Sequence, residues 1–497
     1  MDKQKHYLIK TLGCKANWYD TQALEAQLQQ KGWKPFTDTT QDKNSSIEPD
    51  LCIVNSCTVT DEADRQSRRM ATQLSKEFTQ SRVVLTGCGA EVDPQAYAKT
   101  TGLSFVVGNQ NKPGMVDLLL SKVETTQPTE AEILGSVSNY EQLLSRHPQE
   151  REWPLAEDSF TTPPVGTSLE GLKTRAFLKI QEGCNSFCTY CIIPYGRGPA
   201  RSLRPKEVLK QVQHLVSQGV REVVITGTNI GDFGIDWGVS PDQAVADLFE
   251  LILSETQLER LRVGSLDPTE ITPALISLMQ REPRFCPHFH VSLQATQDRT
   301  LKQMKRKYGN DQVRECLNTL ANLTVVAAPI FVGMDVITGF PGETREEFEA
   351  SLLELSQLPW TRLHVFPYSE RKGTPATRLP GSISIAERLK RSRELNQLSL
   401  KRVTERYETV LRGSKLKNVL LERPVRKPPQ GKASLIPSPY WVQGYSPNYM
   451  RVVLPISEAQ AVSLRNQVVE VDLLSVEIDS GGQDAYFLAQ LSAENTG

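Results

Sequence analysis

Residues 175–191 read RAFLKIQEGCNSFCTYC, a strand-like run that ends in three cysteines. Cys184, Cys188 and Cys191 are separated by three and then two residues, so a single loop carries all of them. Iron–sulfur clusters bind thiolates, and a four-iron cluster has four irons to ligate. Three protein thiolates leave one iron open for a substrate or cofactor. The segment therefore predicts a [4Fe–4S] cluster with an open site, held just past a strand.

This loop has two alternative interpretations, chance clustering and a zinc site. Chance clustering is disfavoured, because nine cysteines in 497 residues give this spacing in roughly 0.003 random chains of this length. A structural zinc ion takes four ligands, and no fourth ligand lies near in sequence, since His214 is too far along the next helical segment. The iron–sulfur interpretation is therefore preferred.

Residues 173–410 contain six strand candidates with helical segments between them, such as Pro205–Gln218 and Thr344–Gln357. Six β-α units in this length predict a partial TIM-like (β/α)6 barrel, in which chemistry lies at the C-terminal ends of the strands. The predicted strands are Arg175–Ile180, Arg221–Thr226, Arg260–Gly264, Phe289–Leu293, Val332–Ile337 and Leu363–Pro367.

Small and polar residues follow the later strands of this predicted barrel. Each is a weak signal alone, because a Gly-Pro turn is often just a turn. Together they place polar groups and close backbone approach around one mouth of the barrel. The candidate binding residues are Gly227, Thr228, Asn229, Ser265, Gln294, Gly339 and Pro341.

Residues 1–121 also alternate strand-like and helix-like segments, which predicts a parallel α/β sheet. The predicted strands are Tyr7–Leu12, Leu51–Asn55, Arg82–Thr86 and Leu103–Val107, with helices at Tyr19–Lys31 and Glu62–Phe78. Cys14, Cys57 and Cys88 each fall just past a strand, at the edge where ligands bind in such sheets. Spacing alone leaves two interpretations open, a second ligand set or three unrelated buried thiols.

The remaining segments differ in charge. Residues 122–172 hold nine acidic and three basic residues, a local charge of −6, and predict a partly ordered acidic connector. Ala386–Lys417 predicts a basic helix with a local charge of +6. Residues 411–497 predict a small β-barrel. Its expected strands are Asn418–Leu421, Met450–Leu454, Gln467–Val471 and Tyr486–Leu491.

Composition sets broad limits on the protein. A length of 497 residues favours three domains, and a hydrophobic fraction of 39% with 23% charged residues is ordinary for a folded soluble chain. The odd number of cysteines argues against a disulfide framework. We expect no signal peptide and no membrane span, and hence a cytoplasmic protein. The net charge of −1 disfavours nucleic acid as a partner only if charge is evenly spread.

The cysteine loop after the first barrel strand, with Tyr190 before the third cysteine, resembles the radical S-adenosylmethionine (radical SAM) superfamily. The resemblance implies that the open iron binds S-adenosylmethionine (SAM), which is cleaved reductively to a 5′-deoxyadenosyl radical. It also implies that Tyr190 and the seven residues at the strand ends surround SAM.

The first lobe resembles a narrower family. The stretches LGCKAN (12–17), VNSCTVT (54–60) and TGC (86–88) are similar to the three signatures of the methylthiotransferases. The order of parts agrees: a Rossmann- or flavodoxin-like α/β domain, a radical SAM barrel and a C-terminal TRAM β-barrel. The resemblance implies that Cys14, Cys57 and Cys88 hold a second [4Fe–4S] cluster. It leaves Cys52, within a strand, and Cys286 and Cys316 as structural thiols.

The family replaces an unactivated C–H bond by C–S–CH3, using SAM as methyl donor and as radical source. Two clusters serving one reaction imply a shared cavity, with the first domain covering the barrel mouth. Residues 63–68, 366–376 and 444–449 are most similar to the branch that modifies N6-threonylcarbamoyladenosine at position 37 of tRNA. Isopentenyladenosine in tRNA and a ribosomal-protein aspartate remain alternative substrates, and a non-catalytic iron–sulfur RNA-binding protein is a third possibility.

The chain departs from the family at Ala295-Thr296, where a Ser-Gly pair is usual, and at Ser56, where Thr is usual. The expected partners are a tRNA anticodon stem-loop and a reductant such as flavodoxin or ferredoxin. We expect a set of basic and aromatic residues to contact RNA phosphates and bases; the alternative is a solvated basic face with ordinary barrel aromatics. They are residues 412–432, Arg65, Arg68, Arg69, Lys302, Lys305, Arg306, Lys307, Tyr440, Trp441, Tyr445 and Tyr449.

Overall fold

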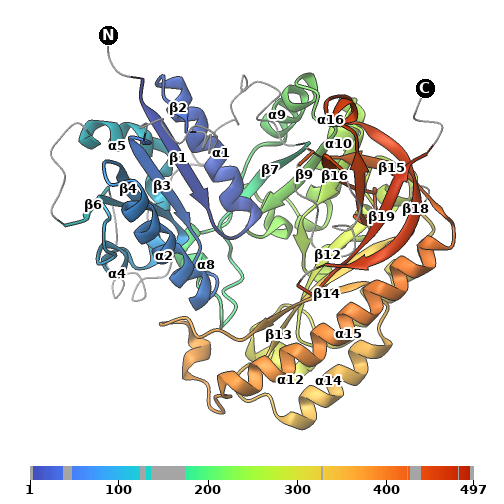
Figure 1. The fold of residues 1–497 in the computed structure, drawn as a ribbon. Helices are drawn as coiled ribbons and strands as arrows, with labels where there is room; N and C mark the ends of the chain where they lie inside the picture. Colours follow the sequence, from blue (N-terminus) through green and yellow to red (C-terminus); the bar gives the residue numbers. More distant parts are fainter. Residues whose placement is uncertain are drawn as a thin grey trace.

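The computed structural model describes residues 4–36, 48–123, 130–135, 174–325, 328–422, 424–425, 438–479 and 481–492. Most of the predicted acidic connector, and residues 426–437 of the basic C-terminal segment, lie outside them. Figure 1 shows a blue N-terminal lobe and a red C-terminal barrel on opposite sides of a green-to-orange central lobe. Among the described residues, no helix has the length and apolarity that a membrane crossing requires.

The N-terminal lobe is one parallel six-stranded sheet with the order β2-β1-β3-β4-β5-β6. Its strands are β1 (His6–Thr11), β2 (Lys34–Pro35), β3 (Leu51–Ser56), β4 (Arg82–Gly87), β5 (Phe105–Gly108) and β6 (Glu132–Leu134). The four predicted strands are all present. The strand β6 corrects the sequence interpretation, because it lies inside the segment read as a connector; three residues give too short a pattern to recognise.

Helices cover both faces of this sheet, which explains why β3 is buried along its whole length. The helices are α1 (Lys15–Gln30), α2 (Asp61–Glu77), α3 (Cys88–Val92), α4 (Pro94–Ala98) and α5 (Met115–Val123), with the 3-10 helix η1 (Asn109–Gly114). The α2 helix begins where the Thr60 side chain accepts a hydrogen bond from the Ala63 amide.

The central lobe has six parallel strand positions in chain order, as predicted. The strands are β7 (Arg175–Glu182), β9 (Glu222–Gly227), β10 (Arg260–Val263) with β11 (Ser265–Leu266), β12 (His288–Gln294), β13 (Phe331–Thr338) and β14 (Arg362–Pro367). The third position is interrupted at Gly264: β10 pairs with β9, and β11 pairs with β12. Two four-stranded sheets result, and the first ends in β8 (Arg201–Ser202), which is antiparallel to β7.

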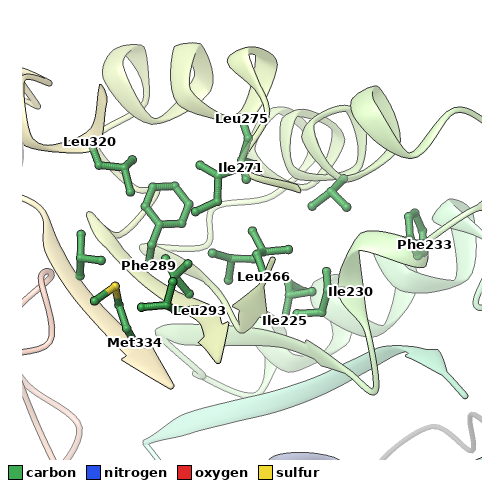
Figure 2. Packing of buried hydrophobic residues seen from close by; sticks show 14 of the residues in the cluster. Ile225, Ile230, Phe233, Leu266, Ile271, Leu275, Phe289, Leu293, Leu320 and Met334 are labelled. Atoms are coloured by element: carbon green, nitrogen blue, oxygen red, sulfur yellow. The ribbon is translucent and has the colours of Figure 1, made fainter. Parts of the chain in front are cut away.

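Side chains on these strands alternate between two environments. Figure 2 shows Leu266, Phe289, Leu293 and Met334 packed in the apolar cluster between the strands and the surrounding helices. The alternate positions are polar, as in the sequence from His288 to Gln294, and face inward. The covering helices are α9 (Pro205–Ser217), α10 (Pro241–Glu255), α11 (Pro273–Arg281), α12 (Asp298–Gln303), α13 (Asn310–Ala321) and α14 (Arg345–Gln357).

The C-terminal lobe is a closed barrel of five strands in the order β15-β16-β17-β19-β18. They are β15 (Lys415–Leu421), β16 (Tyr440–Tyr445), β17 (Arg451–Ile456), β18 (Val468–Ile478) and β19 (Ala485–Leu491), with the short helix α16 (Glu458–Ser463). The long helix α15 (Ile385–Leu411) leads into it along the lower edge of the view (Figure 1). The predicted basic helix to Lys417 is therefore too long, since Lys415 and Lys417 belong to β15.

Candidate active site

The three-cysteine loop follows β7 directly and folds back on itself. The Cys184 amide donates to the carbonyl of Gly198 at 3.0 Å, and the Cys191 amide donates to the carbonyl of Cys188 at 2.9 Å. Gly183 starts the loop with φ +75°, and a Cβ there would collide with the Pro199 carbonyl. This position therefore requires glycine, and the turn sets the direction in which the loop leaves the strand.

A segment before α13 supports the loop from behind. The Thr189 amide donates to the Met304 carbonyl at 3.1 Å, and its hydroxyl donates to the Gln303 carbonyl at 2.8 Å. Arg306 donates to the Cys188 sulfur at 3.0 Å and forms an ion pair with Asp267. The assignment of Arg306 to RNA phosphates is therefore wrong, because its guanidinium is buried against the cysteine loop.

The chemistry of these thiols suits a metal cluster. Burial raises the pKa of Cys184 to about 11 and raises that of Cys191 further, and the neighbouring thiolates add to the effect for Cys191. Bound metal stabilises thiolates and removes this penalty. In the part of the chain that the structure describes, no three His, Cys, Asp or Glu side chains converge on a single metal-ion position. A cubane cluster differs from a single ion in taking one thiolate at each of three separate irons.

The other candidate residues lie around the same end of the strands. Gly227 and Thr228 pack on the base of the cysteine loop, where the Thr228 hydroxyl accepts from the Gly183 amide at 3.2 Å. The Asn229 amide donates to the Gln181 side chain at 2.8 Å. These contacts tie the end of β9 to the end of β7.

Three further loops complete this rim. Ser265 and Gln294 stand on β11 and β12, and Gln294 has φ +66°. The ring of Tyr190 meets Phe340 edge-on at 6.4 Å, which brings the cysteine loop to the turn that holds Gly339 and Pro341. The structure therefore gathers all eight candidates at one end of the central lobe.

The second cysteine set gathers at the sheet edge predicted for it. Gly13 (φ +89°) lies against Cys57, because a Cβ on Gly13 would be 2.6 Å from the Cys57 sulfur. Burial, with smaller contributions from the charges of Cys88 and Cys14, raises the pKa of Cys57 to about 12, as expected for neighbouring thiols. Cys52 lies apart in the buried core of the sheet, as expected for a structural thiol.

Asn17 joins the three loops that carry these cysteines, and the sequence analysis did not single it out. Its side-chain amide donates to the carbonyls of Leu12 at 2.8 Å and Ser56 at 2.9 Å. Its oxygen accepts from Arg197 at 2.5 Å and lies 3.9 Å from the Cys88 sulfur. Asn17 is fully buried, and both polar atoms of its side chain have hydrogen-bond partners. The sequence signal that could have identified Asn17 is its position four residues after Gly13.

The two cysteine loops meet at the junction of the two lobes. The helix α8 (Ile193–Arg197), which follows Cys191, packs against α3, which begins at Cys88. Asn109 connects them, donating to the Cys88 sulfur at 3.3 Å and to the Gly196 carbonyl at 2.8 Å. The expectation that the first domain lies over the end of the barrel that carries the cysteine loop agrees with this packing.

A polar interior lies beside this junction. His290 pairs with Asp335 at 2.8 Å, and the His364 ring lies 5.0 Å from the His290 ring. Gly333 on the strand between them leaves room for both rings. Burial lowers the pKa of Lys15, next to Cys14, and the charge of Asp335 acts on it in the opposite direction. The start of α1 in the N-terminal lobe therefore brings a lysine within electrostatic range of this histidine–aspartate group.

The aromatic residues assigned to RNA bases are mostly engaged elsewhere. Trp441 is buried in the barrel, with an exposed fraction of 1%. Tyr445 and Tyr449 stack on each other at 5.0 Å, and the Arg175 guanidinium lies over both rings. They join the C-terminal barrel to the base of the central lobe, so the interpretation as base-stacking residues is wrong for these three. Tyr440 bonds to Glu458 at 3.4 Å.

The basic residues divide in the same way. Lys302 and Lys305 are exposed, and Lys307 is 56% exposed beside Asp232. Arg65, Arg68 and Arg69 lie on α2 and pair with acidic residues of the same helix. On α15, Arg388 and Arg391 are buried in ion pairs, so part of the +6 charge predicted there serves the fold.

Comparison with known proteins agrees with this architecture. Residues 178–355 match the radical SAM superfamily, and residues 6–108 match the uncharacterized protein family UPF0004. A SAM-dependent radical methyltransferase, TsrM from Kitasatospora setae, has the same fold over 75% of each chain, with a TM-score of 0.52 and 15% identity. The superfamily implies SAM and a [4Fe–4S] cluster.

Curated relatives extend over nearly the whole chain. The threonylcarbamoyladenosine tRNA methylthiotransferase MtaB of Bacillus subtilis is 32% identical over 470 residues, covering 93% of this chain and 92% of the relative. MtaB of Aquifex aeolicus is also 32% identical, covering 83% of this chain and 92% of the relative. A tRNA-2-methylthio-N(6)-dimethylallyladenosine synthase of Corynebacterium urealyticum is 31% identical, covering 77% and 66%. The chain therefore belongs to the methylthiotransferase family of radical SAM enzymes.

Proposed function

We propose that this protein methylthiolates C2 of N6-threonylcarbamoyladenosine at position 37 of tRNA, using SAM both as methyl donor and as radical source. The MtaB enzymes of Bacillus subtilis and Aquifex aeolicus, to which it is similar over most of its length, carry this substrate in their names. The observation that carries the methylthiolation chemistry is the junction of α3 and α8, which brings the loop of Cys88 to the loop that ends at Cys191.

We assign a [4Fe–4S] cluster and SAM to Cys184, Cys188 and Cys191, and a second cluster to Cys14, Cys57 and Cys88. Both sets are uncommitted thiols, since none of the nine cysteines forms a disulfide. When bound, the first cluster and SAM would supply the radical that activates the C–H bond. The second cluster would hold the sulfur that is transferred. The rim residues around SAM would be Tyr190, Gly227, Thr228, Asn229, Ser265, Gln294, Gly339 and Pro341.

The protein's own contribution is to hold these groups at the junction of the two lobes. Arg306 donates a charge-assisted hydrogen bond to the Cys188 sulfur and favours its thiolate. Asn17 fixes the three loops of the second set relative to one another. Buried packing between α3 and α8 holds the loops of Cys88 and Cys191 in fixed positions relative to each other.

We place tRNA on the surface that continues from this junction. The exposed Lys302 and Lys305 remain candidates for phosphate contacts, and the C-terminal barrel is proposed as a TRAM-like RNA-binding domain at 411–497. A cytoplasmic location, and reduction by a flavodoxin- or ferredoxin-like donor, belong to the same proposal.

The alternatives give different products. A relative that acts on dimethylallyladenosine is 31% identical, so the isopentenyl substrate is the second candidate, followed by a ribosomal-protein aspartate. Mass spectrometry of tRNA nucleosides from cells lacking the protein separates them. Loss of 2-methylthio-N6-threonylcarbamoyladenosine, restored by the wild-type gene, is the expected result. Persistence of that nucleoside would refute the assignment.

Iron counting on anaerobically reconstituted protein tests the two-cluster assignment directly. About eight irons per chain support two clusters, and about four refute the second. Detection of 5′-deoxyadenosine from SAM under reducing conditions excludes a purely structural iron–sulfur protein.

A further inference from the structure

Arg197 occupies an unexpected place. In sequence it follows Cys191 by six residues and belongs to the central lobe. In space its guanidinium reaches into the other lobe, donating to the Asn17 side chain at 2.5 Å and to Asp20 at 3.2 Å. It also pairs with Glu182 at 2.6 Å. Its exposed fraction is 3%, so these contacts are fixed inside the junction.

The same guanidinium lies beside the second cysteine set. Asn17, which accepts its hydrogen bond, is the residue that joins the three cysteine loops. Its neighbour Gly196 packs directly on the loop of Cys88, since a Cβ there would lie in van der Waals contact with the Cys88 Cβ at 3.5 Å. Among the charges that act on Arg197, those of Cys88 and Cys14 are both attractive.

Arg197 belongs to a buried ionic group that spans the two lobes. Lys112 and Lys179 contact Asp20 at 2.8 and 2.6 Å, and Lys179 also pairs with Glu182. All five ion-paired side chains are at most 12% exposed. The cations outnumber the carboxylates in this group by three to two. A nearby anion is therefore favoured, and three thiolates on a doubly charged cluster carry a net negative charge.

We propose that Arg197 is a positioning residue that completes the second cysteine site from the opposite lobe, holding its loops through Asn17 and placing a positive charge against the cluster. The inference rests on the proposed second cluster. It assigns the residue to that cluster and not to the SAM cluster whose loop it follows. Hydrogen bonds and charges around the sulfurs set the reduction potential of such clusters.

The test is an EPR-monitored redox titration in which the second cluster is isolated by replacing Cys184, Cys188 and Cys191 with alanine. Arg197→Gln should shift its potential to lower values, because removing a nearby positive charge disfavours the reduced cluster. Asp20→Asn should shift it to higher values. Arg197→Lys, which keeps the charge, should stay near the unsubstituted potential.

Arg391→Gln is the matched control, because Arg391 is equally buried and ion-paired but lies on α15, where its partners are Glu343 and Glu387. It should leave the potential unchanged. If Arg197→Gln loses iron while Arg197→Lys retains about four, the positioning role is supported by that alone. Shifts of the same sign in Arg197→Gln and Asp20→Asn, or no shift in either, would overturn the inference.

Iron content separates this inference from the proposed function. If the variant with alanine in place of Cys184, Cys188 and Cys191 binds no iron, the second cluster is refuted, and the role of Arg197 is refuted with it. If that variant binds about four irons but Arg197→Gln does not change the reduction potential of its cluster, the role of Arg197 is refuted and the second cluster is not.

Discussion

Glu222 offers a stability prediction whose size follows from its surroundings at the base of the central lobe. It is fully buried and contacts Arg262 at 2.8 Å and Arg260 at 3.4 Å. Burial alone would raise the pKa of this carboxyl, but the charges of Arg262, Arg175 and Arg260 outweigh it and lower the pKa from 4.5 to about 2. At 1.36 kcal/mol per unit, the charged form contributes about 3 kcal/mol to stability.

The sign and the pH window follow from linkage. A carboxyl whose pKa is lower in the folded state stabilises the fold above its unfolded pKa near 4.5, and loses that contribution as pH falls toward 2. About 2 kcal/mol should be lost by pH 3. At neutral pH, Glu222→Gln should destabilise the lobe by about 3–5 kcal/mol, since it leaves buried arginines without their anion. The difference in stability between wild type and Glu222→Gln should therefore decrease by about 2 kcal/mol between pH 7 and pH 3.

Hydrogen–deuterium exchange on peptides covering β9 and β10 measures the local opening free energy that this prediction concerns. The control is Glu207→Gln, because Glu207 is an exposed residue of α9 paired with Lys210, and its loss should change little at any pH. A gap between wild type and Glu222→Gln that stays constant from pH 7 to pH 3 would refute the linkage argument.

Two further predictions concern the cysteine sets, and a third concerns the contact between the C-terminal barrel and the central lobe. Cys188→Ala should abolish 5′-deoxyadenosine formation, whereas Cys57→Ala should retain some of it and lose methylthiolation; intact methylthiolation in Cys57→Ala would contradict the second cluster. Gly13→Ala should lose about half of the bound iron, because a Cβ would be 2.6 Å from the Cys57 sulfur; Gly32→Ala, with the same positive φ and open space, is the control for backbone strain. Tyr449→Phe should cost about 1–3 kcal/mol in urea unfolding by losing the Arg175 hydrogen bond, with RNA affinity measured by filter binding unchanged.

The predictable part of this fold had strong local patterns. All six barrel strands and four strands of the N-terminal sheet were located from apolar runs between turn residues. The elements that were missed lacked such patterns. Strands β2 and β6 are two and three residues long. Strand β16 was also missed, because its aromatic residues were interpreted as base-stacking, although Trp441 is buried in a small apolar cluster with Val453, Tyr486 and Leu488.

Charge was the least reliable guide to function. Arg306 and Arg388 contribute to a sequence-level positive charge, yet both are buried and neutralised by carboxylates. Sequence charge counts a buried ion pair and an exposed basic residue alike, because the partner is distant along the chain. The cysteines were predictable for the opposite reason, since strand ends of a parallel sheet meet at one edge whatever their separation in sequence. Asn17 and Arg197 act across the junction, so no local pattern marks them.

The buried ionic group at the junction constrains how the two lobes sit relative to each other. A buried ion pair adds little net stability, because desolvation offsets its attraction, but a displaced partner leaves a buried charge unpaired at a cost of several kcal/mol. Asp20 contacts Lys112 in its own lobe and Lys179 and Arg197 in the other. A small slip between the lobes would break these contacts together, whereas an apolar interface would tolerate it. The ionic group therefore fixes the register of the two lobes, and with it the separation of the two cysteine sets.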